Sequence, residues 1–342
     1  MNTGKTPSPA PGVESSAQPS APAALPHDAK ILVAGHRGLA GSAIMRALKR
    51  HSLPRVVGVS RAEVDLREQA AVRDLFARER PDYVFLAAAR VGGILANCRY
   101  PADFLYDNLM IAANVVEAAH RVGVAKLLFL GSTCLYPRAA PQPMREDHLL
   151  TGPLEPTNEA YAIAKIAGLK LCEAFGRQHG LATVTLMPAN LYGPGDNFDL
   201  EGGHVLAALL RKAHEAKRAG SAAITVWGTG TPLRDFLHAD DLAEACLFAM
   251  ACKECSGMFN VGSGEDISIA ALARLVCETV GFTGGIVFDP EKPDGMPRKL
   301  ADTGRLNALG WRARIALREG LAATYRWYAE TCAKHGPEPL SP

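Results

Sequence analysis

Short apolar runs alternate with longer stretches of helical periodicity over the first half of the chain. The apolar runs lie at 31–34, 55–59, 83–87, 126–130 and 183–187. Between them, apolar residues recur at helical spacing up to residue 48 and then over 70–80, 104–122 and 158–179. Continuous apolar strands separated by amphipathic helices are typical of a parallel sheet that is covered on both faces. The pattern therefore predicts an α/β fold with a doubly wound parallel sheet of the Rossmann type.

The alternation loosens beyond Asn190, where glycine and proline become more frequent. We expect 29–190 to form a cofactor-binding Rossmann domain, to which 238–262 returns. The segments 191–237 and 263–335 are predicted to form a smaller C-terminal α/β lobe that binds a substrate. Ligands of doubly wound sheets bind beyond the carboxyl ends of the strands, so the residues just after each strand are the first candidates for a site.

The composition argues against several classes of protein. A net charge of +2 provides no long-range field that would attract nucleic acid, and no apolar run is long enough to span a membrane. The eight cysteines lie singly apart from Cys252 and Cys255, and none of the spacings completes a zinc site. Residues 1–28 are rich in Pro, Ala and Ser and are predicted to be a disordered tail without a targeting signal. We expect a cytoplasmic protein whose cysteines are reduced thiols and which binds no metal ion.

A glycine-rich turn follows the first predicted strand and begins the next helix. Glycines at this place allow a tight turn and let backbone N–H groups approach a pyrophosphate. The second strand ends at Ser60 and Arg61, where binders of NAD usually have a carboxylate. The pair of Arg37 and Arg61 instead suits the 2′-phosphate of NADP(H), although both could be solvated surface charges. The residues of the predicted loop are Gly35, His36, Arg37, Gly38, Leu39, Ala40 and Gly41.

A serine, a tyrosine and a lysine stand where a hydride-transfer enzyme would need them. Ser132 follows the strand at 126–130, and Tyr161 and Lys165 share one face of the next helix. We expect the Lys165 ammonium to lower the pKa of the Tyr161 phenol, so that the phenol and Ser132 polarise a carbonyl. The alternative of a non-catalytic, NADPH-sensing Rossmann protein is open, but such a protein would need neither Tyr161 nor Lys165.

Further stretches of the chain resemble the extended short-chain dehydrogenase/reductases that act on nucleotide sugars. The closest resemblance is to the GDP-L-fucose synthase family, and it runs from about Lys30 to Trp327. The stretches that carry this closer resemblance are 34–38, 90–94, 131–137, 154–159, 292–295 and 297–299, whereas 187–194 and 234–241 match nucleotide-sugar enzymes more generally. Two rivals within the superfamily stay open. A UDP-sugar 4-epimerase would have an acid at the second strand end, and a 4,6-dehydratase an acidic pair where Cys134 and Leu135 stand.

The resemblance implies an activity and a set of residues for it. The family epimerises GDP-4-keto-6-deoxy-D-mannose at C3 and C5 and then reduces C4 with NADPH. Cys134 and His204 match its proton-transfer pair; the alternatives are a small buried thiol for Cys134 and a surface or capping histidine for His204. The helices at 104–122 and 158–179 resemble those that form its homodimer. The nucleotide-sugar residues are Lys212, Trp227, Arg234 and Asp294. The further cofactor residues are Asp65, Leu66, Leu130, Gly131, Ser132, Lys165, Pro188, Asn190, Leu191 and His204.

Overall fold

The computed structural model describes residues 24–200, 202–292 and 294–335. Most of the predicted tail, up to residue 23, lies outside this range. Residues 24–28 do not behave as predicted, because Leu25 is only 8% exposed and packs into the main hydrophobic core. The ordered part of the chain therefore begins before Lys30. A single buried leucine in a Pro- and Ala-rich segment is too weak a signal to be recognised in the sequence.

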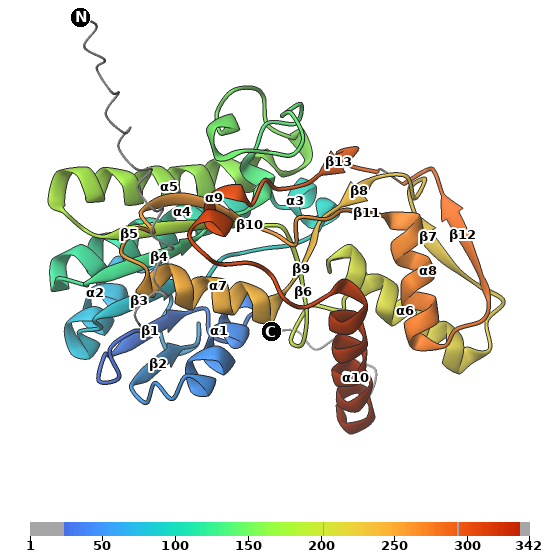
Figure 1. The fold of residues 1–342 in the computed structure, drawn as a ribbon, viewed down its shortest axis with the longest axis horizontal. Helices are drawn as coiled ribbons and strands as arrows, with labels where there is room; N and C mark the ends of the chain where they lie inside the picture. The colour runs from blue at the N-terminus through green and yellow to red at the C-terminus, as the bar shows by residue number, and fades with distance from the viewer. Residues whose placement is uncertain (1–23, 201, 293, 336–342) are drawn as a thin grey trace, which may run out of the picture.

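A sheet of six parallel strands forms the centre of the molecule (Figure 1), which confirms the predicted doubly wound α/β fold. The strand order β10-β5-β4-β3-β1-β2 places β1 between β2 and β3, so the chain changes direction across the sheet at β1. Ligands of such sheets bind at this change of direction. The strands are β1 (Ile31–Ala34), β2 (Val56–Val59), β3 (Tyr83–Leu86), β4 (Lys126–Leu130), β5 (Thr183–Pro188) and β10 (Gly257–Val261).

Helices cover both faces of this sheet, and alternate residues of β1 show how the faces are shared. Ile31 and Val33 pack into a core with helices α1 and α7, whereas Leu32 and Ala34 pack into a second core with α2, α4 and α5. Both faces of the strand are apolar because both are covered. The helices are α1 (Leu39–Arg50), α2 (Gln69–Glu79), α4 (Pro101–Val122), α5 (Glu159–His179) and α7 (Ala239–Ala251).

A third hydrophobic core lies among later elements, away from the large sheet (Figure 1). Two small sheets, β12-β7 and β11-β8-β13, are built here with three helices. The large number of elements within 191–237 and 263–335 agrees with an α/β character, while the domain boundaries themselves stay a prediction. The helices are α6 (Val205–Ala219), α8 (Ile269–Val280) and α10 (Leu317–His335). The strands are β7 (Ala223–Trp227), β8 (Leu233–Arg234), β11 (Ile267–Ser268), β12 (Gly285–Asp289) and β13 (Arg298–Lys299).

A two-strand connection carries the chain away from the large sheet and back to it. β6 (Asn190–Tyr192) follows β5 directly and pairs in parallel with β9 (Phe236–His238), which leads into α7. The residues between β6 and β9 include the whole of α6 and β7. This pairing sets these elements beyond the carboxyl end of β5.

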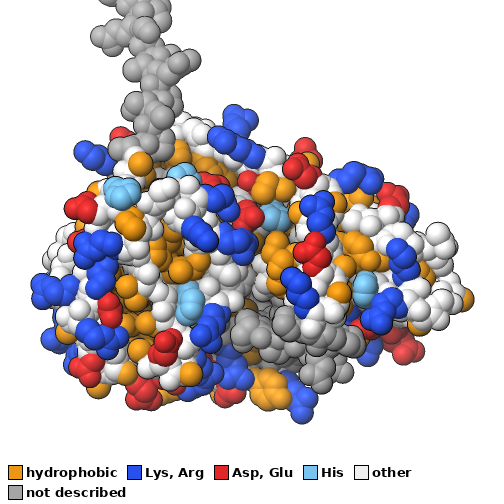
Figure 2. All heavy atoms as spheres, turned by 90° about the horizontal axis from the view of Figure 1, so that it is seen from below, with side chains coloured by type: hydrophobic (Ala, Val, Ile, Leu, Met, Phe, Trp, Pro, Cys, Tyr) orange, Lys and Arg blue, Asp and Glu red, His pale blue; other side chains and the backbone are white. Residues whose placement is uncertain are grey.

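The surface carries no dominant charge on the face that Figure 2 shows. Lysine and arginine side chains are interspersed there with acidic ones, in line with the net charge of +2. Among the described residues, no helix combines the length and the apolar character that crossing a membrane requires.

Candidate active site

The turn between β1 and α1 is packed too closely for any side chain at two of its glycines. A Cβ at Gly35, which has a φ of +85°, would lie 2.6 Å from the backbone of Ala88 after β3. A Cβ at Gly41 would lie 2.0 Å from the Gly35 carbonyl oxygen. Gly38 is the N-cap of α1, and no side chain caps the helix there. The first turn of α1 therefore keeps backbone N–H groups for an anionic ligand.

A cavity of about 590 Å³ opens over this turn. Its walls include loop residues 35–39 and, from the predicted set, Arg61, Asp65, Leu66 and His204. Ala87, Ala88 and Ala89 form its floor after β3, where small side chains leave room. The other predicted cofactor residues are not among the described residues that line this cavity: Ala40, Gly41, Leu130, Gly131, Ser132, Lys165, Pro188, Asn190 and Leu191.

The two predicted phosphate-binding arginines lie at the rim of the cavity. The Arg61 side chain is 69% exposed, and its Nε lies 3.9 Å from the Asp65 carboxylate. A carboxylate does stand near the end of β2, at Glu63, and it was not predicted from the sequence. The Glu63 carboxylate accepts hydrogen bonds from the backbone N–H and the hydroxyl of Ser60, at 2.8 and 2.6 Å. These bonds, above all the one from the hydroxyl, hold the pKa of Glu63 below its usual value.

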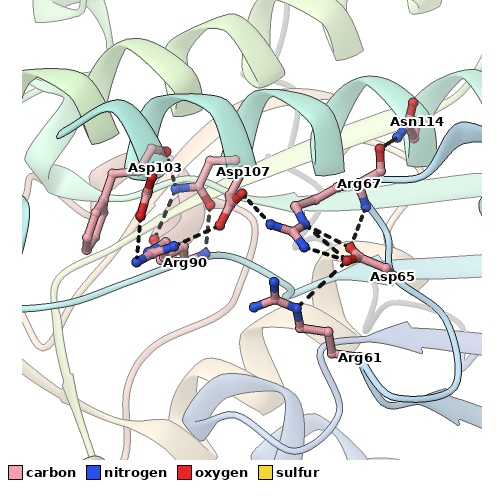
Figure 3. A network of polar contacts seen from close by, with 9 residues as sticks. Arg61, Asp65, Arg67, Arg90, Asp103, Asp107 and Asn114 are labelled. Atoms are coloured by element: carbon pink, nitrogen blue, oxygen red, sulfur yellow. Dashed lines mark hydrogen bonds and ion pairs between the residues drawn. The ribbon is translucent and has the colours of Figure 1, made fainter. Parts of the chain in front are cut away.

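An ion-pair network continues along the same rim (Figure 3). Arg67 bridges two carboxylates, with Nη2 at 2.6 Å from Asp65 and Nη1 at 2.9 Å from Asp107 on α4. Arg90 also pairs with Asp107, at 3.1 Å, and with Asp103. The hydrogen bond from Arg67 lowers the pKa of Asp65 to about 2. Arg67, Arg90 and Asp107 line the cavity and were not predicted from the sequence.

Ser132 and Tyr161 come together as predicted, but the lysine does not act on the phenol as expected. Ser132 hydrogen-bonds the Tyr161 phenol, and its Oγ accepts the backbone N–H of Cys134 at 3.1 Å. Burial and the nearby Cys134 raise the pKa of Tyr161, so the predicted lowering was wrong. Lys165 Nζ donates instead to the Leu130 carbonyl oxygen at 2.8 Å, and burial lowers the pKa of Lys165 to about 8.

The Cys134 thiol lies beside this pair, in η1 (Thr133–Leu135) just after β4. The Nζ of Lys299, which β13 contributes, is 3.4 Å from the Cys134 Sγ. Burial by itself raises the pKa of Cys134. The charge of Lys299, hydrogen bonds with Ser132 and Lys299, and the nearby His204 outweigh burial and bring the pKa below its ordinary value. Lys299 was not predicted from the sequence as a site residue.

His204 is held by a buried carboxylate that was likewise not predicted. His204 is the N-cap of α6, and its Nδ1 lies 3.3 Å from Oδ1 of Asp196, whose side chain is 2% exposed. Burial opposes a positive charge on the imidazole ring and by itself would lower the pKa of His204. The hydrogen bond to Asp196, the charge of Asp196 and the nearby Cys134 prevail and raise the pKa of His204. Asp196 follows Gly195, which turns the chain with a φ of +89°.

A second cavity, of about 290 Å³, contains the predicted substrate residues. Lys212, Trp227, Arg234 and Asp294 all line it, together with Cys134 and His204. His204 lines both cavities, so it stands where they meet. The Nζ atoms of Lys212 and Lys292 lie 5.1 and 5.5 Å from the centre of the Trp227 ring. Within the described residues, no group of three or more His, Cys, Asp and Glu side chains could hold a metal ion.

Comparison with known proteins places this chain in a family. Residues 31–262 match the NAD dependent epimerase/dehydratase family. The probable GDP-L-fucose synthase 1 of Oryza sativa subsp. japonica is 53% identical over 93% of this chain and 98% of that protein. The GDP-L-fucose synthase of Escherichia coli (strain K12) is 51% identical over 88% of this chain and 97% of that protein. The chain belongs to this family, in its GDP-L-fucose synthase group.

The fold of this family member also matches a solved structure of the same group. The structure of a GDP-L-fucose synthetase from Naegleria fowleri bound to NADP superposes with a TM-score of 0.85 at 29% sequence identity. The match covers 93% of this chain and 99% of that one. The predicted resemblance to the extended short-chain dehydrogenase/reductases is thereby confirmed in sequence and in fold.

Two buried acceptors lie in the wall of the second cavity. Asn97 on α3 (Ile94–Arg99) is 8% exposed, and its Nδ2 donates to the carbonyls of Gly92 and Gly93. The Oδ1 atoms of Asn97 and of Asn158 are buried and accept no hydrogen bond from the described residues. Both side chains line the same cavity as Cys134. Buried acceptors of this kind suit hydroxyl donors of a ligand.

Proposed function

We propose that the protein converts GDP-4-keto-6-deoxy-D-mannose to GDP-L-fucose, by epimerisation at C3 and C5 and then reduction at C4 with NADPH. The observation that carries the proposal is the convergence of two kinds of chemistry in one place. A thiol and an imidazole, Cys134 and His204, line one cavity beside the hydrogen-bonded pair of Ser132 and Tyr161. The relatives of the same group are named as GDP-L-fucose synthases, which supports the proposed product.

NADPH fits the cavity over the β1–α1 turn. The tight glycine turn leaves backbone N–H groups for a pyrophosphate, and Arg37 and Arg61 at the rim can hold a 2′-phosphate. Glu63 is already engaged by Ser60, which leaves the arginines to select the cofactor. When bound, NADPH supplies the hydride for C4. The related synthetase from Naegleria fowleri was solved with NADP bound, which supports this choice of cofactor.

The epimerisations use the acidity that a ketone gives to the carbons on either side of it. The Cys134 thiolate takes a proton from C3 or C5 and becomes a thiol, while the electron pair moves onto the C4 oxygen. The His204 imidazolium then gives its proton to the opposite face of the same carbon. Exchange with solvent resets both groups. The lowered pKa of Cys134 and the raised pKa of His204 favour these starting forms, which make Cys134 the base and His204 the acid.

The reduction uses Tyr161 as the acid. Ser132 and the phenol would hydrogen-bond the C4 oxygen, and Tyr161 would give its proton to that oxygen when C4 is reduced. Since burial raises the pKa of Tyr161, the phenol keeps this proton at neutral pH. Lys165, anchored on the Leu130 carbonyl, keeps a positive charge one helical turn away on α5.

The far end of the substrate cavity suits the nucleotide. Trp227 is 36% exposed and can stack on guanine, and the ammonium groups near its ring can pair with a diphosphate. The Asp294 carboxylate accepts the backbone N–H of Thr229 at 2.8 Å, which fixes its position. Arg234 donates to the Asp294 backbone carbonyl at 3.4 Å.

Asn97 and Asn158 supply acceptors for the two hydroxyls, on C2 and C3, that this keto sugar retains.

We further infer a homodimer formed by α4 and α5, and a cytoplasmic protein. The two helices pack side by side at one edge of the molecule (Figure 1). Both leave large apolar side chains exposed, among them Tyr106 at 60% and Leu109 at 36% on α4, and Ile163 at 44% on α5.

A cytoplasmic environment suits eight cysteines that form no disulfide among the described residues. The division at 190, 238 and 262 is likewise retained as a proposal.

The function is tested by incubation with GDP-4-keto-6-deoxy-D-mannose and NADPH, with NADPH absorbance and product stereochemistry as the readouts. The wild-type protein is expected to consume NADPH and yield GDP-L-fucose. In Tyr161→Phe the acid is lost, so NADPH oxidation should fall by about 10²-fold or more. Exchange of the C3 and C5 protons with D₂O should persist in this variant, because Cys134 and His204 remain.

The complementary variant is Cys134→Ser. Loss of the base should abolish deuterium exchange at the epimerised carbons while NADPH still binds. Wild-type exchange in Cys134→Ser, or full turnover in Tyr161→Phe, would remove the respective residue from the mechanism. A wild-type protein that leaves the keto sugar and NADPH unchanged would refute the proposed function as a whole.

A further inference from the structure

We propose that Lys299 keeps the Cys134 sulfur anionic and thereby sets the pH range over which the protein can remove protons from carbon. Lys299 is a positioning residue in this proposal, since it acts through Cys134. The inference rests on the proposed function, because it explains how the base of the epimerisation is prepared.

The contact itself joins two distant parts of the sequence. Lys299 Nζ lies 3.4 Å from Cys134 Sγ, across a separation of 165 residues. Both residues line the substrate cavity, and both side chains are partly exposed to it. Arg234 lines the same cavity, but its guanidinium donates to the carbonyls of Leu233 and Asp294. Among the cations of the described residues, Lys299 is therefore the one in contact with the sulfur.

Backbone contacts on both sides fix the place of Lys299. β13 pairs in parallel with β8, which sets Lys299 opposite Arg234, and the Lys299 carbonyl accepts the N–H of Asp235 at 3.1 Å. The next residue, Leu300, donates its N–H to Gln142 Oε1 at 2.9 Å and accepts the N–H of Met144 at 2.7 Å. These contacts hold the backbone of Lys299 in a paired strand. The side chain therefore starts from a fixed position beside the thiol.

The charged and titratable groups that face the thiol come from several elements. From η1 and α5 come the neutral Ser132 and Tyr161, from α6 His204, from β8 Arg234 and from β13 Lys299. Burial raises the pKa of Cys134, and the Lys299 charge is the strongest of the influences that lower it. His204 also favours the thiolate, but only while it is protonated. The Lys299 ammonium contacts the sulfur directly, at 3.4 Å, so its attraction for the thiolate does not depend on the proton of His204.

The test measures the thiol directly, without sugar. Iodoacetamide reacts with the thiolate, so its rate of alkylation of Cys134 against pH reports the midpoint of ionisation. The modified peptide is followed by mass spectrometry because the exposed Cys98 also reacts. Lys299→Met should move the midpoint upward by about one pH unit, and the rate at pH 7 should fall about tenfold. Lys299→Arg keeps the charge and should stay within about threefold of the wild-type rate.

Lys292→Met is the matched control. Lys292 lines the same cavity, but its ammonium faces the Trp227 ring and not the thiol, so its removal should leave the midpoint unchanged. Lys299→Gln serves as a second neutral variant, and circular dichroism confirms that each variant is folded. An unchanged midpoint in both neutral variants, or an equal shift in Lys292→Met, would overturn the assignment.

Kinetics with the keto sugar separates this inference from the proposed function. If the proposal holds, the pH dependence of C3 and C5 deuterium exchange shifts upward in Lys299→Met, in parallel with alkylation. Failure of the wild-type protein to exchange these protons would refute the function, whatever the alkylation shows. Wild-type exchange with an unshifted pH profile in Lys299→Met would refute the role of Lys299 alone.

Discussion

The acid and the base of the proposed epimerisation each depend on one neighbour of opposite charge. Cys134 has Lys299, and His204 has Asp196, at 3.4 and 3.3 Å. Each neighbour favours the charged form of its partner, the thiolate in one case and the imidazolium in the other. The two charged forms also favour each other. These contacts therefore favour the protonation state from which the proposed epimerisations would begin.

Asp196→Asn should shift the basic limb of the pH profile of deuterium exchange at C3 and C5 of the keto sugar. Asp196 raises the pKa of His204, so the imidazolium persists to higher pH in the wild-type protein. Loss of the carboxylate charge should move the fall in C3 and C5 exchange to lower pH by about one unit. The acidic limb, which belongs to Cys134, should move much less. The measurement is deuterium exchange into the keto sugar between about pH 5 and pH 9.

A double variant gives the control for this prediction. In a His204→Gln background the group that Asp196 tunes is gone, so the added Asp196→Asn change should have no further effect on the pH profile. If Asp196→Asn shifts the profile equally in both backgrounds, Asp196 acts on another group and its assignment to His204 is wrong.

At the scale of elements, the sequence pattern was a reliable guide to the buried strands of the large sheet and to the long helices. The run at 31–34 coincides with β1, and 126–130 with β4, because buried parallel strands are apolar throughout. The helix predicted over 158–179 begins one residue later, at Glu159. The short α3 was not predicted, since six residues carry too little periodicity. α3 supplies Asn97, so one wall of the substrate cavity was missed with it.

Among the site residues, those within sequence motifs could be predicted and their partners could not. Ser132, Tyr161 and Lys165 follow strands or share a helix face, and such spacing is visible in a sequence. Asp196 follows a glycine turn, and Lys299 ends the two-residue strand β13, so neither belongs to a recognisable spacing pattern. Only the fold brings them to His204 and Cys134. The expected effect of Lys165 on Tyr161 failed for a related reason, because burial and the Leu130 carbonyl are not visible in the spacing.

The ion pairs of Arg67 connect the segment after β2 to α4, and Arg67→Met should weaken this connection. The change would leave the Asp107 carboxylate, 7% exposed, with Arg90 alone and would release Asp65. Because Asp107 stays buried with half of its charge partners, we expect the free energy of unfolding to fall by about 2 kcal/mol at pH 7. Urea denaturation measures it. The pKa of Asp65 is lowered from 3.8 to about 2, so its contribution is present above pH 3.8 and fades as the pH falls toward 2.

Arg78→Met provides the comparison for Arg67. Arg78 is 62% exposed and pairs with its neighbour Glu79 at 2.9 Å. Its loss should change the free energy of unfolding by less than about 0.5 kcal/mol, because exposed pairs contribute little. Equal effects of the two substitutions, or a loss for Arg67→Met that does not diminish in acid, would contradict the structural role given to the network.

At the scale of the whole molecule, the proposed dimer predicts a change of mass on substitution. The double variant Tyr106→Glu with Ile163→Glu places two carboxylates on the exposed faces of α4 and α5, where burial between subunits would be costly. Sedimentation velocity should give a dimer for the wild-type protein and a monomer for this variant. Val287→Glu is the control, since Val287 is 54% exposed on β12, and it should remain a dimer. A wild-type protein that sediments as a monomer would refute the proposed homodimer.

The late position of β13 in the chain also has a consequence for Cys134 during protein synthesis. Cys134 is made early, as soon as the first strands of the large sheet exist, whereas Lys299 emerges only when nearly all of the chain has been translated. During that interval the sulfur has no ammonium beside it and reacts as an ordinary thiol. On the proposed role of Lys299, the Cys134 thiol of the nascent chain is less ionised than that of the folded protein, and the un-ionised thiol is the weaker nucleophile. Alkylation of Cys134 should then become faster once β13 is in place.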